Sequence, residues 1–229
     1  MHLKHLLLLA ALLLLPVMAL KAQDSLRHEV LIETSMGNIR VALYNETPRH
    51  RANFLRLVGE GFYDGVLFHR VIEKFMIQAG DSASRHAEPG QQLGDSPEGY
   101  TVPAEIRYPQ LFHKRGALAA AREGDQVNPE RASSASQFYI VYGRRFTDEG
   151  LDKVQERLNA STDGQVVLTP EIREAYKAKG GTPHLDGQYT VFGEVLEGLD
   201  VVRDIQWVET DPNDRPLQDV RIIRMTVVK

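Results

Sequence analysis

Short runs of strand-forming residues separated by turns are the feature that most constrains how this 229-residue chain can fold. Apolar residues fill positions 30–32, Gly37-Asn38 supplies a turn, and apolar side chains then alternate with other residues over 39–43. Comparable short runs occur further along the chain, at 66–72, 75–78, 189–195 and 220–228. Alternation with a period of two, punctuated by turn residues, is typical of antiparallel strands with one buried face. The sequence therefore predicts a mainly β protein in the form of a barrel.

Two helices are predicted to accompany these strands. Thr47 followed by Pro48 gives an N-cap and a first-turn proline, and apolar side chains follow at helical spacing until Gly59. A last short helix is predicted at 199–205, before the final strand.

The stretch 143–181 differs in character from the strands around it. Thr147 precedes an acidic first turn, and Thr169-Pro170 begins a second apolar stripe that ends at Gly180-Gly181. These are start and stop signals for two consecutive helices. We interpret 143–181 as a helical hairpin that is inserted into the β domain and packs on it.

The N-terminal segment is predicted to lie outside the folded domain. Lys4 and its neighbours precede an uninterrupted apolar run over 6–20, and Ala22 then comes before polar residues, which is typical of a secretory signal peptide. A membrane anchor is the alternative, but the run is short for a span of about 20 residues and contains Pro16. We expect 1–22 to be a signal peptide, 23–229 to be the folded domain, and the protein to be exported, periplasmic or secreted.

Charge and composition exclude several classes of function. The formal net charge is −4, and it becomes −6 once Lys4 and Lys21 leave with the signal peptide, so nothing attracts nucleic acid. The chain has no cysteine, which excludes disulfides, thiol catalysis and cysteine metal sites. No two histidines of the mature chain have the close spacing of a helical metal pair, so no metal site is predicted. No second apolar run is long enough to span a membrane.

The segment 68–81 mixes charged and amide side chains with large apolar ones in a way that is unusual for a strand: it reads FHRVIEKFMIQAGD. Three later segments have a similar mixture, GALAAAR at 116–122, SQFYI at 136–140, and HLDG at 184–187 followed by VFG at 191–193. The four motifs, in this order, resemble the signature of the cyclophilin family from about residue 30 to the C-terminus, interrupted by 143–181.

The resemblance implies a fold and a function. The implied fold is a closed eight-stranded antiparallel β-barrel capped by two helices, with the substrate groove on its outer face. The implied function is that of a peptidyl-prolyl cis/trans isomerase, which accelerates X-Pro bond rotation in unfolded or partly folded exported polypeptides and so assists their folding. No cofactor is implied, and we expect a monomer.

The resemblance also implies the site. By position, Arg70 matches the catalytic arginine of the family. The implied substrate-binding residues are Phe75, Met76, Gln78, Ala121, Gln137, Tyr139, His184, Leu185 and Tyr189. Because strand side chains alternate, Gln137 and Tyr139 share one face, which we assign to the groove, whereas Phe138 and Ile140 face the core. The chain departs from the best-known pattern at four positions, where other members carry tryptophan, asparagine, phenylalanine and histidine: His184, Arg122, Tyr139 and Tyr189.

The chemistry of X-Pro rotation explains why these residue types suit it. Rotation about a peptide bond costs about 18–20 kcal/mol because amide resonance must be broken, and no bond to carbon is cleaved. A catalyst therefore needs an apolar pocket for the proline ring and a donor that favours the twisted amide. Arg70 can be that donor, because the prolyl nitrogen regains a lone pair as resonance is lost.

Two other classes of function compete with the isomerase. A cyclophilin-like binding module or holdase without catalysis is compatible with His184 and Arg122. A hydrolase using a serine and a histidine is the third class, but the serines at 133–136 lack a glycine-flanked nucleophile elbow.

Overall fold

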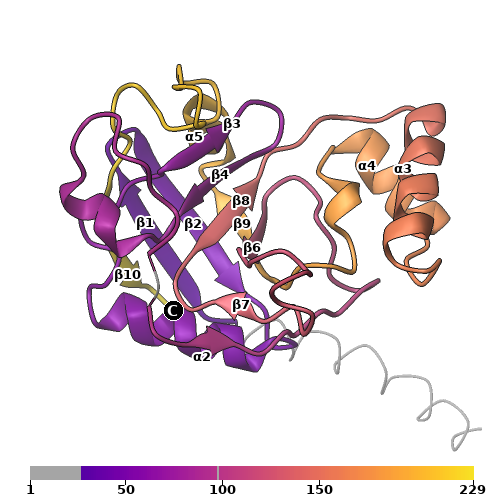
Figure 1. Cartoon of the computed structure of the whole chain (residues 1–229), viewed down its shortest axis with the longest axis horizontal. Helices are drawn as coiled ribbons and strands as arrows, with labels where there is room; N and C mark the ends of the chain where they lie inside the picture. The colour runs from indigo at the N-terminus through magenta and orange to yellow at the C-terminus, as the bar shows by residue number, and fades with distance from the viewer. Residues whose placement is uncertain (1–26, 97) are drawn as a thin grey trace, which may run out of the picture.

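Antiparallel pairing joins strands from both ends of the chain into one curled sheet (Figure 1). The computed structural model describes residues 27–96 and 98–229, so the predicted signal peptide lies outside the described residues. The main sheet has eight strands in the order β10-β1-β2-β9-β6-β8-β4-β3. Their bounds are β1 (Glu29–Thr34), β2 (Gly37–Leu43), β3 (Arg70–Ile72), β4 (Met76–Ala79), β6 (Ala117–Ala120), β8 (Phe138–Val141), β9 (Val191–Glu197) and β10 (Ile222–Val227). The prediction of a mainly β, eight-stranded antiparallel architecture is confirmed.

The two outermost strands of this sheet are β3 and β10. Residues 66–68, which were predicted as part of a strand, instead make isolated backbone bonds to the start of β10. The Phe68 N–H donates to the Val220 carbonyl at 2.8 Å, and the Ile222 N–H donates to Val66 at 2.8 Å. A separate small sheet pairs β5 (Thr101–Val102) with β7 (Ser133–Ser134).

The first hairpin forms as predicted, although its turn lies slightly earlier than expected. Thr34 pairs with Gly37, so the turn residues are 35 and 36 and Gly37 already belongs to β2. The Thr34 hydroxyl accepts from the Met36 N–H at 3.0 Å and donates to the Gly37 carbonyl at 2.6 Å. This side chain closes the turn, because threonine can satisfy nearby backbone groups.

Two helices cover opposite ends of the sheet: α2 (Pro48–Gly59) and α5 (Leu199–Ile205) (Figure 1). Helix α2 begins at the predicted place, with Thr47 at the N-cap position and Pro48 in the first turn, but the Thr47 side chain makes no capping bond. The Glu105 carboxylate accepts from the Arg49 and His50 N–H groups instead, at 3.1 and 2.9 Å. A carboxylate at a helix N-terminus satisfies donors that lack partners within the helix and suits the helix dipole.

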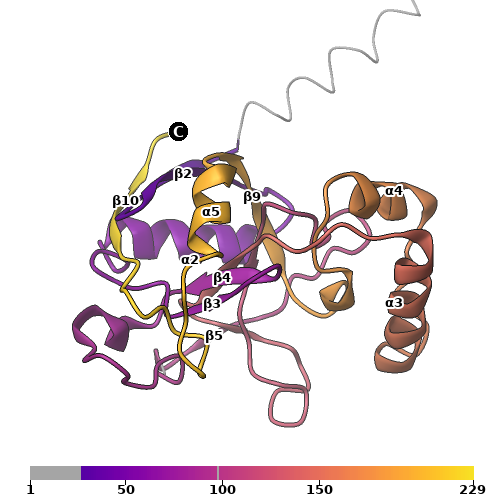
Figure 2. The same ribbon diagram turned by 90° about the horizontal axis from the view of Figure 1, so that it is seen from above.

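The helices α3 (Asp148–Ser161) and α4 (Pro170–Ala178) lie beside the sheet in both views (Figures 1 and 2). Their predicted caps are confirmed, since the hydroxyls of Thr147 and Thr169 accept from N–H groups of the first turns. A cluster of apolar side chains joins the two helices and the loop between them: Leu151, Val154, Leu158, Val166, Leu168, Ile172 and Tyr176. Two short 3₁₀ turns, η2 (Ser82–His86) and η3 (Pro183–Leu185), complete the described helical elements.

The two ends of the α3–α4 segment meet at a pair of glycines. The Gly181 N–H donates to the Arg144 carbonyl at 3.0 Å. A Cβ on Gly143 would lie 2.2 Å from the Gly181 carbonyl oxygen, and Gly143 has a φ of 64°. Only glycine permits so close an approach of two backbones in this conformation. The two ends of the α3–α4 segment therefore lie next to each other.

Apolar side chains gather on both faces of the curled sheet. The larger cluster contains Phe138 and Ile140 of β8 together with residues of α2 and α5. The second cluster contains Met76, Tyr139 and Val191, with Phe75 and Leu185 packed against it. Alternation along β8 thus assigns Phe138 and Ile140 to one cluster and Tyr139 to the other, as predicted. Among the described residues, no helix is long and apolar enough to cross a membrane.

Candidate active site

A row of polar side chains crosses neighbouring strands at one edge of the sheet. The register of β3 and β4 places Arg70 opposite Gln78, and their side chains are 3.5 Å apart from Nη1 to Oε1. The Gln78 amide donates to Gln137 Oε1 at 3.0 Å, and the Gln137 amide donates to the Gly94 carbonyl at 2.8 Å. Each amide therefore orients the next group, and Gln78 presents its oxygen to Arg70.

Arg70 has a second neighbour that the sequence did not indicate. Its Nε lies 3.4 Å from Asp214 Oδ2, and the Asp214 carbonyl accepts from the Val71 N–H at 2.8 Å. Asp214 belongs to the loop before β10, far from any of the four motifs, so no local pattern marks it. The arginine side chain stays about 44% exposed, which leaves guanidinium N–H groups free to meet a ligand.

The predicted pocket residues come together in the second apolar cluster. Met76 and Tyr139 are buried there, and Phe75, Leu185 and Tyr189 pack against them. The His184 ring stacks on Phe75 with centroids 5.5 Å apart. Met76 belongs to β4, which pairs with the strand β3 that carries Arg70, so part of this cluster lies on the neighbouring strand.

Ala121 also packs against the second apolar cluster, but its backbone N–H and carbonyl already make hydrogen bonds within the protein. Its N–H donates to the Gln137 carbonyl at 3.0 Å, and its carbonyl accepts from the Ser134 N–H at 2.8 Å. Only the second lone pair of the carbonyl is available to a peptide.

Two of the residues that depart from the family pattern contact each other. The Arg122 guanidinium lies 4.4 Å from the centroid of the Tyr189 ring, which is a cation–π arrangement. Arg122 Nε also donates to the Gln188 carbonyl at 2.8 Å, and its Nη1 lies 2.6 Å from Asp125. Arg122 is therefore held within the structure.

Tyr139, a third departure, ends a buried chain of hydrogen bonds. Its hydroxyl lies 3.0 Å from His113 Nε2, and His113 Nδ1 lies 3.0 Å from Asp186 Oδ1. The Tyr176 hydroxyl of α4 donates to the other oxygen of Asp186 at 2.7 Å. The sequence assigned no role to His113 or Asp186, because their partners are distant in the sequence. Tyr139 lies 26 residues from His113, and Tyr176 lies 10 residues from Asp186.

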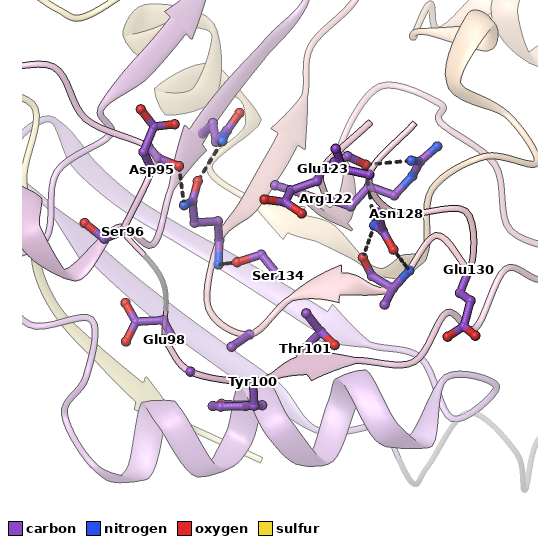
Figure 3. Close-up of a pocket in the computed structure, with 18 of the residues that line it drawn as sticks. Asp95, Ser96, Glu98, Tyr100, Thr101, Arg122, Glu123, Asn128, Glu130 and Ser134 are labelled. Carbon is purple, nitrogen blue, oxygen red and sulfur yellow. Dashed lines mark hydrogen bonds between the residues drawn. The ribbon is translucent and has the colours of Figure 1, made fainter. Parts of the chain in front are cut away.

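A cleft of about 930 Å³ lies next to this site and shares Gln78, Ala121 and Gln137 with it (Figure 3). Asp95 and Glu98 lie on one side of the cleft, and acidic residues also line the other side. The full acidic set is Asp95, Glu98, Glu123 and Glu130. Among the described residues, Glu98 Oε1 is buried without a hydrogen-bond partner.

A serine, a histidine and a carboxylate do line up elsewhere in the fold. His50 Nε2 lies 2.9 Å from the Ser133 hydroxyl, and His50 Nδ1 lies 2.8 Å from Glu105. Burial lowers the pKa of His50 against the opposing effect of Glu105. A nucleophile must reach its substrate, yet Ser133 is only 1% exposed and Glu105 is occupied with the start of α2. The arrangement serves as a structural link between α2 and the small sheet.

His69, next to Arg70, is 3% exposed, and neither ring nitrogen has a hydrogen-bond partner among the described residues. Burial lowers its pKa to about 4, although Asp81 acts in the opposite direction. His69 is therefore neutral at physiological pH. Residues 27–96 and 98–229 contain no group of three or more histidine or acidic side chains that could hold a metal ion.

Comparison with known proteins agrees with this geometry. Residues 29–227 match the family described as "Cyclophilin type peptidyl-prolyl cis-trans isomerase/CLD". A peptidyl-prolyl cis-trans isomerase of Staphylococcus aureus (strain COL) is 35% identical over 195 residues, which cover 85% of this chain and 88% of that protein. A bifunctional phosphatase/peptidyl-prolyl cis-trans isomerase of Streptococcus pyogenes serotype M6 is 36% identical over 197 residues, which cover 85% of this chain but only 37% of that protein.

A solved structure shares the fold. The crystal structure of a cyclophilin-type peptidyl-prolyl cis-trans isomerase of Cryptosporidium parvum superposes with a TM-score of 0.63 at 23% sequence identity, covering 89% of this chain and 98% of that one. The chain therefore belongs to the cyclophilin-type peptidyl-prolyl cis-trans isomerases, the enzymes that interconvert the cis and trans forms of X-Pro peptide bonds.

Proposed function

We propose that Arg70 is the catalytic residue of this isomerase and that the apolar cluster beside it is the proline pocket. The observation that carries the proposal is the partly exposed Arg70 guanidinium, which lies at the end of a row of glutamines and on the strand that pairs with the one carrying Met76. Two anchors, Asp214 and Gln78, hold the guanidinium in place, so little freedom is lost when substrate binds.

In this proposal the proline ring enters the pocket formed by Phe75, Met76 and Leu185, and Tyr139 forms its floor. The peptide backbone crosses Gln78 and Gln137, and it meets the remaining lone pair of the Ala121 carbonyl. His184 and Tyr189 border the pocket. As the amide twists, an Arg70 N–H donates to the prolyl nitrogen, whose lone pair is free only when resonance is lost. This bond is absent in the planar ground states, so it lowers the barrier in both directions.

We further propose that the substrates are exported polypeptides with unfolded or partly folded X-Pro segments. The support is the apolar run at 6–20, which is preceded by Lys4 and followed by Ala22. The proposal requires that the isomerase itself is exported. Mass spectrometry of the protein recovered from outside the cytoplasm tests its export, and we expect that protein to lack residues 1–22. Retention of the full-length chain in the cytoplasm would contradict it.

Two finer features of the fold are also proposals. Closure of the sheet into a barrel is supported by the backbone bonds that join 66–68 to 220–222. The status of 143–181 as an insertion is supported by the contact between Gly143 and Gly181 and by the separate apolar cluster of α3 and α4. We also propose that the protein acts as a monomer without a cofactor.

The decisive experiment measures the rate of cis-to-trans conversion of a short X-Pro peptide with the mature protein and with Arg70→Ala. Removing one preorganised donor from a transition state costs about 10²–10³-fold in rate, and we expect a loss of that order in kcat/KM. Arg224→Ala is the matched control, because Arg224 is also an exposed strand arginine paired with a carboxylate, here Glu33. Binding of the peptide without acceleration by the native protein would decide for the non-catalytic holdase.

A further inference from the structure

We propose that Tyr176, Asp186 and His113 are positioning residues for the proline pocket, and that they couple helix α4 to isomerisation through the Tyr139 side chain. The proposal rests on the assignment of Tyr139 to the pocket floor. The observation behind it is one continuous chain of buried hydrogen bonds from α4 to β8.

The chemistry of Asp186 fixes the direction of the bonds at its end of the hydrogen-bonded chain. The Asp186 carboxylate can only accept, and it faces three donors: the Tyr176 hydroxyl, the His113 backbone N–H at 2.9 Å, and His113 Nδ1. In the tautomer with its proton on Nδ1 alone, the imidazole has a lone pair on Nε2, and the Tyr139 hydroxyl then donates to it. In this arrangement the carboxylate, both ring nitrogens and both hydroxyls each have a hydrogen-bond partner.

Burial gives the chain its rigidity. Tyr176 and Asp186 are completely enclosed, and His113 and Tyr139 are at most 5% exposed. Water cannot replace a lost partner at such positions, so an unpaired group is costly. Loss of the Tyr176 hydroxyl leaves one oxygen of Asp186 without its donor, and the carboxylate and His113 must shift to compensate.

The shift would reach the pocket through the hydrogen bond between His113 and the Tyr139 hydroxyl. His113 lies parallel to the Tyr139 ring, with centroids 6.1 Å apart, so a movement of His113 that this bond transmits displaces the pocket floor. Helix α3 contacts the neighbouring turn η3 as well. The α3–α4 hairpin is thus mechanically connected to the pocket.

The test is a double-mutant cycle with Tyr176→Phe and Tyr139→Phe, read as kcat/KM for an X-Pro peptide. We expect Tyr176→Phe to lower kcat/KM about tenfold in the native background and less than twofold in the Tyr139→Phe background, because no hydroxyl remains there to be positioned. The control is Tyr108→Phe, which removes a hydroxyl that also ties down the hairpin region, through the Val167 carbonyl at 2.6 Å, but lies outside the chain of bonds. It should leave kcat/KM unchanged.

Equal effects of Tyr176→Phe in both backgrounds, or an effect no larger than that of Tyr108→Phe, would overturn the coupling. A second measurement needs no variant: ¹⁵N NMR of the folded protein should show His113 protonated at Nδ1 and not at Nε2, and the opposite tautomer would refute the bond directions. Failure of the pocket assignment is recognised separately, since Phe75→Ala would then leave kcat/KM unchanged. A pocket that depends on Phe75 but not on Tyr176 refutes the coupling alone.

Discussion

Three residues that differ from the family pattern make specific side-chain contacts in this structure. Arg122 lies against Tyr189, and the Tyr139 hydroxyl lies within hydrogen-bond distance of His113 Nε2. A phenylalanine at 139 would leave His113 Nε2 without this partner, and an asparagine at 122 is too short to lie over the Tyr189 ring. Arg122 and Tyr189 are therefore two departures in mutual contact, whereas the departure at Tyr139 supplies a hydroxyl to buried His113.

His69 gives a prediction about pH. Its pKa is about 4 in the folded protein, mainly because of burial, and about 6.5 in an unfolded chain. Between these values the unfolded state binds a proton that the folded state does not. Above pH 6.5 His69 is neutral in both states and does not reduce the free energy of unfolding. As the pH falls from 6.5 toward 4, the free energy of unfolding decreases by about 3 kcal/mol in total because of this residue.

Urea unfolding at a series of pH values from 7 to 4 measures this loss. In His69→Gln that part of the decline should be absent, whereas His86→Gln, at an exposed position, should behave like the native protein. An equally steep decline in His69→Gln would show that other groups are responsible.

At the scale of elements, the α3–α4 hairpin depends on the backbone contact between its two ends. Gly143→Ala should destabilise the protein by at least about 2 kcal/mol, because it combines a left-handed φ with a collision against the Gly181 carbonyl. Gly164→Ala, between α3 and α4, is the control: its φ is 72°, but nothing lies within 4 Å of the added Cβ.

Thermal unfolding of the two variants separates the collision from the backbone conformation. We expect the larger loss at Gly143. Equal losses at both positions would mean that the left-handed conformation alone sets the cost and that the two ends of the hairpin can move apart.

At the scale of the whole molecule, an acidic protein carries an acidic cleft beside its proposed groove. In the proposed binding mode, a peptide that crosses Gln78 and Gln137 continues over this cleft, because both glutamines also line it. Glu98 there has a buried oxygen without a hydrogen-bond partner among the described residues. We expect X-Pro peptides with lysine next to the X-Pro pair to have a several-fold lower KM than those with glutamate. The difference should shrink in about 0.5 M salt, because salt screens exposed charges.

Stopped-flow or NMR exchange rates for matched lysine, alanine and glutamate peptides measure this preference. The double variant Glu98→Gln with Glu123→Gln should reduce it, whereas Glu174→Gln, an exposed change on α4, should not. Equal KM values for the three peptides at low salt would show that the peptide does not pass over the cleft.

Much of the fold was predictable because its signals are local. The β1–β2 hairpin follows from alternation around a turn, and α3 and α4 follow from Thr147, Thr169 and apolar stripes whose members lie three or four residues apart. The strand predicted at 66–72 was too long, because residues 66–68 bond to residues more than 150 positions away. Strand propensity is a local property, so it cannot predict partners that are this distant in the sequence.

For the site, the four motifs were enough to indicate which residues come together: Arg70, the two glutamines and the apolar pocket residues, all of which the fold gathers. The groups that hold these residues in place became known from the three-dimensional arrangement alone. Glu105 replaces Thr47 at the start of α2, Asp214 joins Arg70, and Asp186 links α4 to His113. Capping and alternation act within a few residues, whereas these partners meet only after the strands have paired, so their identity depends on the complete path of the chain.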